Sequence, residues 1–467
     1  MLRRIEVKNF KSLKHLDYRC AKLNLLMGLN GAGKSSFVQS LLLLRALENH
    51  VEKECYEMPL CEIVGDDDEG ATFEDLKYCY AKPNEDVEFR VDFDVKIRTV
   101  KDAREVGSIA RVVRPGNRED SVIEVWNPDC LKERDVADNF ITRQRDAYAL
   151  KVENNESITA EEYERMEADE KQVVNEAMSH IREAMKHESP FIEDYRSLWK
   201  RANMVSAFRG HPRQIHRGDP KGSWLFGVRF NPEGNDVGGF LAECGMQCCL
   251  YESPREKNPL IFPGAEMHES TIPDDDRKHT FLLEQVQLWL NIVSPGAKVS
   301  FEKVMVGNRK RYVQSVAYGD KKFKPENVGF GVSDILPVLT ALLTSRPGDI
   351  VIIENPEAHL HPKGQAKMGE LLARAAAYGV QLFVETHSDH VINGIRVAAA
   401  EKIIKSEDVN IAFFERKEHC DLSVDGAVKN ETYAEVRNIK VDDQGSLSEY
   451  PADFMDEWNN QLMELIS

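Results

Sequence analysis

The residues with the clearest chemical meaning form a glycine-rich stretch near the N-terminus. Residues 28–35 read Gly-Leu-Asn-Gly-Ala-Gly-Lys-Ser, a complete G-x-x-x-x-G-K-S pattern. They follow an apolar run at 23–27 and precede a helix-like stretch at 36–47, which is the strand, loop and helix context of a phosphate-binding loop. The pattern predicts that ATP or a related nucleoside triphosphate is bound by Gly28, Asn30, Gly31, Gly33, Lys34, Ser35 and Ser36.

Each residue type in this loop has a physical reason to be there. Glycines let backbone N–H groups point into a concave nest around phosphates. Lys34 would reach the β- and γ-phosphates, and the Ser35 hydroxyl would hold Mg²⁺. The following helix adds its positive N-terminal end. An incidental glycine turn is the alternative, and the flanking strand and helix disfavour it.

A phosphate loop also needs a carboxylate on a neighbouring strand to hold Mg²⁺, directly or through water. Residues 350–353 read as a buried strand, with Glu354 at its C-terminal end, where α/β sheets present their ligands. Ser35 and Glu354 are therefore the predicted metal residues. A second buried strand at 380–385 ends in Thr-His-Ser, which places the imidazole of His387 to sense a γ-phosphate.

A third candidate segment lies between these two halves. Residues 327–334 read Asn-Val-Gly-Phe-Gly-Val-Ser-Asp, a Gly/Ser turn that opens an apolar helix. The N–H groups at such a helix start suit an anion. Gly331 and Ser333 are the candidate residues here.

The elements that must position these residues indicate an α/β protein. The last third alternates helix at 332–344, 363–377 and 389–400 with strand at 349–354, 380–385 and 409–415, which predicts a parallel sheet with crossover helices. Strict apolar–polar alternation at 87–95 predicts a half-buried antiparallel strand. An amphipathic helix at 281–293 and a hairpin at 297–305 and 311–318 complete the set.

The composition along the chain indicates three parts. Residues 1–129 carry the phosphate loop and an antiparallel β lobe, and 130–203 form a highly charged stretch that we expect to be a helical insertion. Residues 204–467 carry the remaining motifs and a short C-terminal tail. The expected fold is thus an α/β P-loop NTPase with a mixed sheet, an antiparallel β lobe and a helical insertion.

Composition excludes several classes of protein. The 467 residues are 42% hydrophobic and 30% charged, without an apolar run that would span a bilayer or an apolar signal segment at the start. We therefore expect a cytoplasmic protein whose nine cysteines are reduced. Cys244, Cys248 and Cys249 form the one tight group, but a metal site would want a second ligand pair that is not obvious.

The net charge of −18 does not indicate a nucleic-acid-binding surface, although a local basic patch would suffice for one. The two basic candidates are the first 22 residues and the segment from Arg209 to Arg217. Basic residues in strands and loops more often form solvated surface. DNA thus remains an open partner that the charge does not favour.

Several segments together resemble a known family, the SMC/RecF-like branch of ABC-type ATPases and especially bacterial relatives of the OLD proteins. The resemblance rests on residues 4–13, 28–36 and 327–336, on Ile-Glu-Asn-Pro-Glu-Ala-His-Leu-His-Pro at 353–362, and on Val-Glu-Thr-His-Ser-Asp-His at 384–390. It implies an ABC/SMC head fold that hydrolyses ATP with Mg²⁺. It also implies a homodimer or higher homo-oligomer, in which Gly331 and Ser333 act on ATP held by the opposite protomer. His387 matches the switch histidine, and Ala358 to His361 match a loop that crosses the dimer interface.

The sequence departs from this family in two places. The usual Asp-Glu pair after the strand appears as Glu354 and Asn355, and Asn cannot accept a proton, so the expected general base is missing. Glu357 is the nearest carboxylate that could replace it; alternatively, Glu357 caps the next helix. No glutamine contact loop can be assigned at 60–130.

Three functions are compatible with these features. OLD nucleases continue into a nuclease domain, but only a short tail without a strand-bound acidic cluster follows His387. The resemblance therefore favours an ATPase subunit of an anti-phage defence system such as PARIS, with a separate effector and a phage-encoded trigger. The alternative is a RecF/SMC-like ATPase of DNA repair or chromosome maintenance that binds DNA directly. A transporter motor is disfavoured because the L-S-G-G-Q signature is absent.

Overall fold

The structure is a computed structural model. It describes residues 1–48, 57–59, 76–81, 85–96, 104–114, 121–125, 172, 197–199, 202–206, 215–217, 237–253, 257–269, 277–307, 309–422 and 428–466. Nearly all of the expected helical insertion at 130–203 and most of the basic segment at 209–217 lie outside these residues, as does most of the region in which a glutamine loop was sought.

Contacts divide the chain into two compact units, and both are discontinuous in sequence. The first comprises Met1, Cys20–Arg45 and Leu198–Ser467, and the second comprises Leu2–Arg19 and Ala46–Ser197. The first unit holds every candidate site residue that the sequence suggested.

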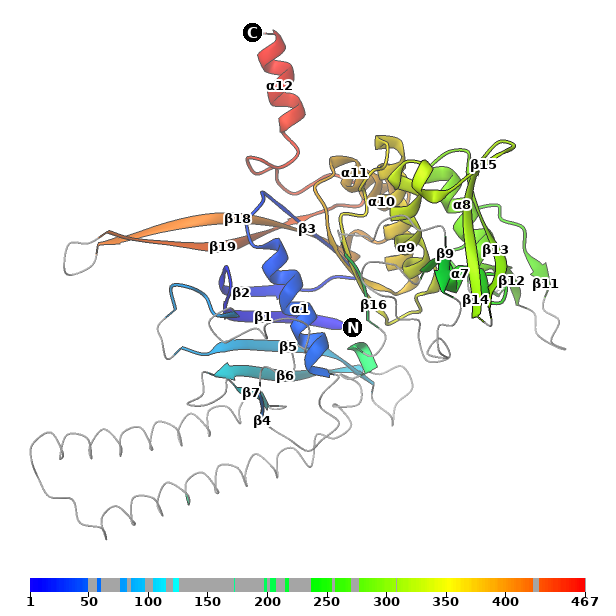
Figure 1. Ribbon diagram of the computed structural model, residues 1–467. Coiled ribbons are helices and arrows are strands. Elements are labelled where there is room, and N and C mark those ends of the chain that lie inside the picture. The colour runs from blue at the N-terminus through cyan, green and yellow to red at the C-terminus, as the bar shows by residue number, and fades with distance from the viewer. Residues whose placement is uncertain are drawn as a thin grey trace, which may run out of the picture. The chain divides into compact units, whose positions relative to one another are not determined.

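The first unit is built on a six-stranded mixed sheet (Figure 1). Its order is β19 (Val428–Lys440), β18 (Val409–Leu422), β3 (Leu23–Gly28), β17 (Gln381–Glu385), β16 (Ile350–Glu354) and β8 (Asn203–Val205). All neighbours are parallel except β18 and β19, which pair antiparallel. The predicted parallel sheet is therefore confirmed. The long β18–β19 hairpin was not expected, because only a strand at 409–415 was predicted.

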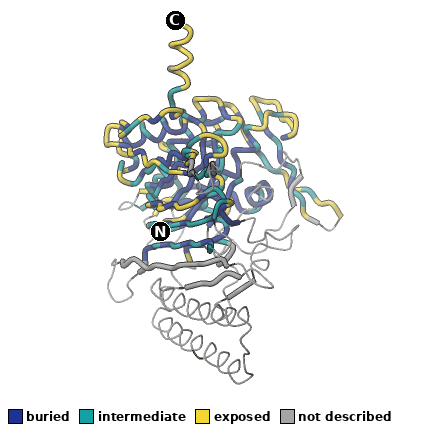
Figure 2. The backbone as a smooth tube through the Cα atoms, turned by 90° about the vertical axis from the view of Figure 1, so that its left-hand side faces the viewer, coloured by how far each residue is buried: buried dark blue, intermediate teal, exposed yellow. Residues whose placement is uncertain are grey.

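Apolar helices cover this sheet, and they match the predicted segments closely. They are α1 (Lys34–Glu48), α8 (Leu282–Val293), α9 (Phe330–Thr344), α10 (Pro362–Tyr378) and α11 (Asp389–Ala400). The central strands β16 and β17 are buried almost throughout, and they share one large apolar core with α8, α9, α10 and α11 (dark blue in Figure 2). Helices α10 and α11 approach so closely that a Cβ on Gly394 would lie 2.0 Å from the Ala366 carbonyl oxygen.

Smaller elements complete the first unit. The hairpin of β13 (Ala297–Val306) and β14 (Arg309–Tyr318) was predicted, and β9 (Ile215–Arg217) and β15 (Lys321–Phe323) extend it. A three-stranded sheet joins β10 (Cys249–Glu252), β12 (Lys278–Phe281) and β11 (His268–Glu269), next to helix α7 (Val237–Cys244). The short helices η2 (Pro325–Asn327) and η3 (Ser406–Asp408) precede α9 and β18.

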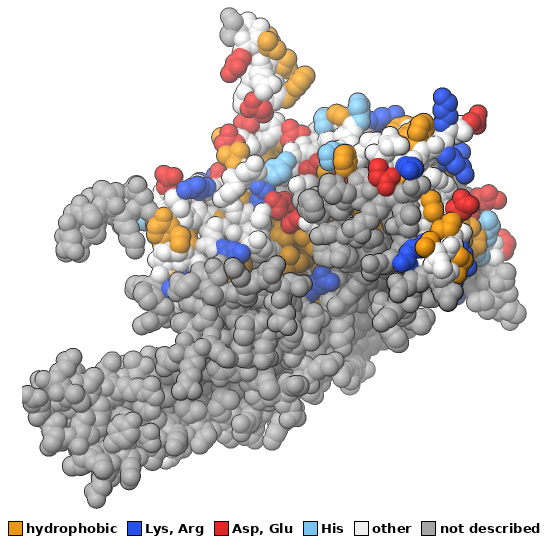
Figure 3. Space-filling model, viewed as in Figure 1, with side chains coloured by type: hydrophobic (Ala, Val, Ile, Leu, Met, Phe, Trp, Pro, Cys, Tyr) orange, Lys and Arg blue, Asp and Glu red, His pale blue; other side chains and the backbone are white. Residues whose placement is uncertain are grey.

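The C-terminal helix α12 (Glu457–Ile466) has an exposed apolar side, visible in Figure 3. Its most exposed large apolar residues are Trp458, Met463, Leu465 and Ile466. Among the helices that the structure describes, none is both long and apolar enough to cross a bilayer.

The second unit contains a six-stranded antiparallel sheet. Its order is β2 (Leu13–Arg19), β1 (Leu2–Phe10), β5 (Val87–Lys96), β6 (Arg104–Arg114), β7 (Ser121–Val125) and β4 (Glu57–Pro59). Along β5 the buried residues Val87, Phe89, Val91 and Phe93 alternate with Glu88, Arg90 and Asp92, as the predicted half-buried strand requires. The expected antiparallel β lobe is therefore present.

Candidate nucleotide-binding site

The predicted phosphate loop has the local geometry that the pattern requires. Strand β3 ends at Gly28, and helix α1 begins at Lys34. Gly28, Gly31 and Gly33 have φ values of 130°, 75° and 112°, which side chains with a Cβ rarely adopt. A Cβ on Gly28 would also lie 2.2 Å from the carbonyl oxygen of Phe414 on the neighbouring strand β18. The loop therefore needs glycine at this position for conformation and for space.

Lys34 lies at the centre of this loop. Its ammonium donates hydrogen bonds of 2.7 Å and 2.9 Å to the carbonyl oxygens of Gly28 and Leu29. The residue is only 3% exposed, and this burial lowers its pKa, while the nearby Glu385 carboxylate acts in the opposite direction. The positive charge of the Lys34 ammonium thus lies inside the glycine loop, where it would neutralise the charge of a phosphate.

Two carboxylates stand at the ends of adjacent parallel strands, and one of them, Glu385, interacts with Lys34. Glu354 ends β16 and Glu385 ends β17, and the two residues are paired in the register of the sheet. The Oε1 atom of Glu385 lies 3.5 Å from the Ser35 hydroxyl oxygen. Glu354 is one strand further from β3, and its Oε2 atom lies 3.5 Å from the hydroxyl oxygen of Ser206, which follows β8.

Glu385 is a site residue that the sequence reasoning missed. It is 8% exposed, and this burial raises its pKa. Lys34 and the Ser35 hydrogen bond lower the pKa of Glu385, whereas Glu354 and Glu357 raise it. The sequence signal was its place at the end of a buried strand, directly before Thr-His-Ser. That signal went unused because the carboxylate after the preceding strand already filled the expected role.

These oxygen donors suit the cation that the fold implies. Mg²⁺ prefers hydroxyl and carboxylate oxygens, and it commonly takes one or two protein carboxylates and completes its shell with phosphate oxygens and water. Ser35, Glu354 and Glu385 fit this description. Within the described residues there is no group of three or more His, Cys, Asp or Glu side chains that would hold a metal by protein ligands alone. The thiols of Cys244, Cys248 and Cys249 form no disulfide.

Asn355 has a backbone conformation that accounts for its residue type. Its φ is +45°, in the left-handed region that Asn and Asp tolerate better than most residues with a Cβ. Its N–H donates a 2.8 Å hydrogen bond to the Glu385 carbonyl oxygen, and its own carbonyl oxygen accepts from Ala358. Asn355 therefore begins the tight turn that follows β16.

Glu357 lies in the same turn and is hydrogen-bonded to the turn that follows β17. Its Oε1 atom accepts a 2.9 Å hydrogen bond from the backbone N–H of His387. Its Oε2 atom is buried without a hydrogen-bond partner. The alternative in which Glu357 caps the following helix is wrong, because the N-cap of α10 is His361, whose ring accepts from the Lys363 N–H.

The imidazole of His387 lies near Lys34 and Glu357. Partial burial lowers its pKa below the usual 6.5, Lys34 adds to that lowering, and Glu357 opposes it. The lowered pKa favours the neutral imidazole. The flanking residues fix the turn, since Ser388 caps α11 by accepting from the Val391 N–H and donates to Gln365 of α10 over 2.6 Å.

Gly331 and Ser333 lie at the start of α9, packed against the turn that follows β16. A Cβ on Gly331 would lie 2.8 Å from the His359 carbonyl oxygen, and Asp334 is 3.5 Å from the His359 ring nitrogen. The hydroxyl of Ser333 is buried without a partner. Between described residues, no hydrogen bond or ion pair joins Gly331 or Ser333 to Lys34 or Ser35. The structure thus brings the signature residues to the 358–361 loop rather than to the phosphate loop of the same chain.

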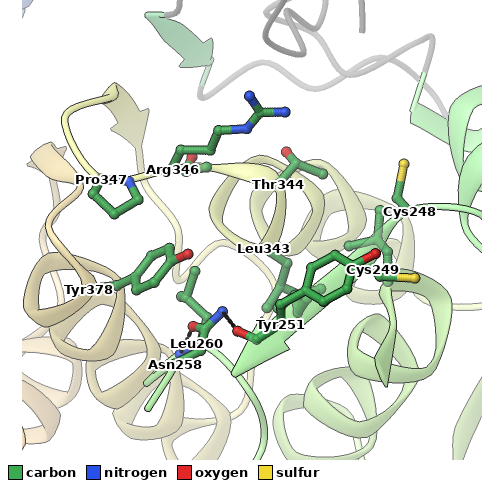
Figure 4. A pocket seen from close by; sticks show the side chains of 13 residues that line it. Cys248, Cys249, Tyr251, Asn258, Leu260, Leu343, Thr344, Arg346, Pro347 and Tyr378 are labelled. Carbon is green, nitrogen blue, oxygen red and sulfur yellow. Dashed lines mark hydrogen bonds between the residues drawn. The ribbon is translucent and has the colours of Figure 1, made fainter. Parts of the chain in front are cut away.

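A separate cavity of about 560 Å³ (Figure 4) lies near the N-terminal ends of β16 and β17. It is lined by residues that precede β16 and β17, such as Arg346, Pro347 and Tyr378, and by Cys248 and Tyr251. The phosphate loop follows the C-terminal end of β3, so the cavity is distinct from the nucleotide site. Its lining includes no carboxylate.

Three families match parts of the sequence. Residues 1–213 match a family described as "AAA ATPase domain", and residues 256–393 match one described as "AAA domain, putative AbiEii toxin, Type IV TA system". Residues 404–465 match a family described as "Protein of unknown function (DUF3696)". A search among curated proteins found no match.

Solved structures similar to this chain include SMC head domains, all at low identity. The head of an Smc protein bound to the C-terminal winged-helix domain of ScpA has a TM-score of 0.41 and 12% identity, covering 93% of this chain and 97% of that chain. A Pyrococcus furiosus Smc head bound to the C-terminal domain of ScpA has the same score and identity, covering 100% and 99%. The SMC head of Thermotoga maritima has a TM-score of 0.34 and 10% identity, covering 93% and 98%.

The family matches agree with the architecture of the described residues. A glycine loop between a parallel strand and a helix, carboxylates at the ends of the adjacent strands, and an antiparallel β lobe are all present. The predicted α/β P-loop fold class is confirmed, and residues 1–213 and 256–393 match models of AAA ATPase domains.

Proposed function

We propose that this chain is an ATP-binding switch protein that hydrolyses ATP slowly and controls a separate effector in a bacterial anti-phage defence system. The ATPase part rests on one observation: Lys34, Ser35 and Glu385 come together at the C-terminal ends of β3 and β17. The defence role is supported by the matched family whose description names the AbiEii toxin and a type IV toxin–antitoxin system. A phage-encoded trigger and a cytoplasmic location belong to the same proposal.

In this proposal the loop binds the triphosphate by charge and by backbone dipoles. Lys34 exchanges its bonds to the loop carbonyls for the β- and γ-phosphates, and the N-terminus of α1 supplies backbone N–H groups. Ser35, Glu354 and Glu385 would hold Mg²⁺, which neutralises the phosphate charge that develops during transfer. His387 would report the γ-phosphate to Glu357 through the hydrogen bond that its backbone N–H donates to the Glu357 carboxylate.

Slow turnover follows from the residue that stands after Glu354. The amide of Asn355 cannot take a proton from the attacking water, so another group must do so. Glu357 is the candidate base, because one of its oxygens is buried without a partner beside His387. A switch that dwells in its ATP-bound state is served by such a site.

Assembly through ATP-sandwiched heads is the second part of the proposal. The N-terminus of α9, with Gly331 and Ser333, packs on the 358–361 loop and makes no polar bond to the phosphate loop of its own chain within the described residues. A homodimer or higher homo-oligomer would place this helix start on the γ-phosphate held by the partner subunit. An anion there would meet a buried, unpartnered Ser333 hydroxyl.

Calorimetric titration with Mg·ATP tests the nucleotide site. Lys34→Ala removes the buried ammonium and should abolish measurable binding and all ATP-dependent activity. Lys321→Ala removes an exposed lysine of β15 and should bind as the wild type does. If Lys34→Ala retains wild-type affinity, or the wild type binds no ATP, the proposed function is wrong.

Direct DNA binding by the N-terminal basic segment is the less favoured alternative. Arg3 pairs with Asp94, Lys8 with Glu88, and Lys22 with Asp408. Arg4 is bonded to Asp17 over 2.6 Å, and this bond raises the pKa of Arg4. Basic groups that already have carboxylate partners are poorly placed to neutralise DNA phosphates. DNA affinity that falls steeply with added salt would favour the alternative.

A further inference from the structure

The carboxylate nearest to the phosphate loop belongs to the strand next to it. Strand β17 pairs directly with β3, whereas β16 is one strand further away, and adjacent strands are about 4.8 Å apart. Glu385 reaches to 3.5 Å from the Ser35 hydroxyl oxygen. The expected metal residue Glu354 instead has its carboxylate 3.5 Å from Ser206, on the far side of β16.

The surroundings of Glu385 favour a cation at this point. Glu385 is 8% exposed. Lys34 is its positively charged neighbour, and Glu354 and Glu357 are its negatively charged neighbours. One buried carboxylate and two half-buried carboxylates around one ammonium leave excess negative charge at this point. A divalent cation between Ser35 and Glu385 would compensate that charge.

We propose that Glu385, rather than Glu354, is the principal carboxylate that holds Mg²⁺ in this site, opposite the Ser35 hydroxyl. The contact is direct or passes through one water of the Mg²⁺ shell, as is usual for this ion. This inference rests on the proposed nucleotide binding. The metal residues expected from the sequence, Ser35 and Glu354, do not include Glu385.

The test compares two isosteric variants, Glu385→Gln and Glu354→Gln, in metal-binding experiments that do not require hydrolysis. Affinity for a fluorescent ATP analogue is measured in EDTA and then as a function of added Mg²⁺, and Mn²⁺ binding to the nucleotide complex is followed by electron paramagnetic resonance. Glu385→Gln should keep or improve its affinity for metal-free nucleotide, because a negative charge near the phosphates is removed. Its apparent affinity for Mg²⁺ and Mn²⁺ should fall about 10–100-fold.

Glu354→Gln is the matched control at the paired register position, and its metal affinity should fall less than that of Glu385→Gln. The reverse order, or equal metal affinity of Glu385→Gln and wild type, overturns the inference while leaving the nucleotide site intact. Failure of the wild type to bind any nucleotide would instead remove the proposed function. Glu385→Asp keeps the charge but shortens the side chain, so intermediate metal affinity is expected if the Gln variant unfolds.

Discussion

The backbone N–H of His387 donates a 2.9 Å hydrogen bond to the carboxylate of Glu357. The bond joins the turn after β17 to the turn after β16. Both turns lie at the C-terminal ends of the parallel strands, where the phosphate loop also begins. A displacement of one turn, such as a γ-phosphate contact to His387 would cause, therefore acts directly on the candidate base.

The first prediction concerns Glu357 as that base. Glu357→Gln can still accept the His387 N–H bond but cannot accept a proton, so hydrolysis should fall about 10²–10⁴-fold while ATP affinity stays unchanged. Steady-state phosphate release and calorimetric titration measure the two quantities. Glu357→Ala serves as a comparison, because it also removes the bond to His387 and should disturb the turn. Wild-type hydrolysis in the Gln variant would exclude Glu357 as the base.

Asn355 gives a second prediction that its backbone conformation sharpens. Asn355→Glu introduces a carboxylate where the expected base is missing, but at φ +45° a longer side chain costs about 1 kcal/mol or more. Asn355→Asp tolerates this conformation better and also brings a carboxylate. We expect faster hydrolysis in both, with the lower melting temperature in the Glu variant. Rates at or below wild type in both variants would show that position 355 cannot support a base.

The third prediction is that two carboxylates, Glu385 and Glu370, give opposite pH dependences of the free energy of unfolding. The pKa of Glu385 is raised above 4.5, chiefly by burial, so the folded state binds this proton more tightly and loses stability as the pH rises from 4.5 through the folded-state pKa. Glu385→Gln should therefore be more stable than the wild type at pH 7, and the gain should shrink as the pH falls toward 4.5. Urea unfolding across this pH range measures it.

Glu370 on α10 provides the control of opposite sign. It is half-buried, which raises its pKa, but hydrogen bonds from Lys367 and Arg374 lower the pKa overall. Its contribution is present above 4.5 and is lost as the pH falls through the depressed folded-state pKa. Glu370→Gln should thus destabilise the protein at pH 7 and have less effect in acid. Parallel pH profiles for the two variants would contradict this account of both groups.

The fourth prediction concerns assembly through the signature helix. Ser333→Arg fills the start of α9 with a long side chain and should abolish hydrolysis, as Lys34→Ala does, whereas Ser333→Ala should fold and retain part of the activity. Mixed with each other, the two inactive variants should recover partial activity through one intact composite site. The wild-type rate per subunit should also fall on dilution below the dissociation range of the dimer. A rate per subunit that is independent of dilution would rule out the sandwich.

Much of the site was predictable from local pattern. Glycines with a Lys-Ser end specify the phosphate loop, because only a few backbone conformations present so many N–H groups at once. Short apolar runs bounded by turn residues specified β16 and β17 and the helix between them, since buried parallel strands leave little room for polar residues. These elements were placed within one or two residues of their observed bounds, for example α10 at 362–378 against the predicted 363–377.

The order of the strands could not be obtained in this way, because it depends on contacts between residues far apart in sequence. The insertion of β17 between β3 and β16 makes Glu385, and not Glu354, the closest carboxylate to Ser35. The positive φ of Asn355 and the bond from His387 to Glu357 arise from the packing of two turns that sequence alone leaves separate. Residue types thus determined the glycine-rich loop and the strands that flank it, and tertiary structure decided which carboxylate reaches that loop, because distance across a sheet depends on strand order rather than on sequence spacing.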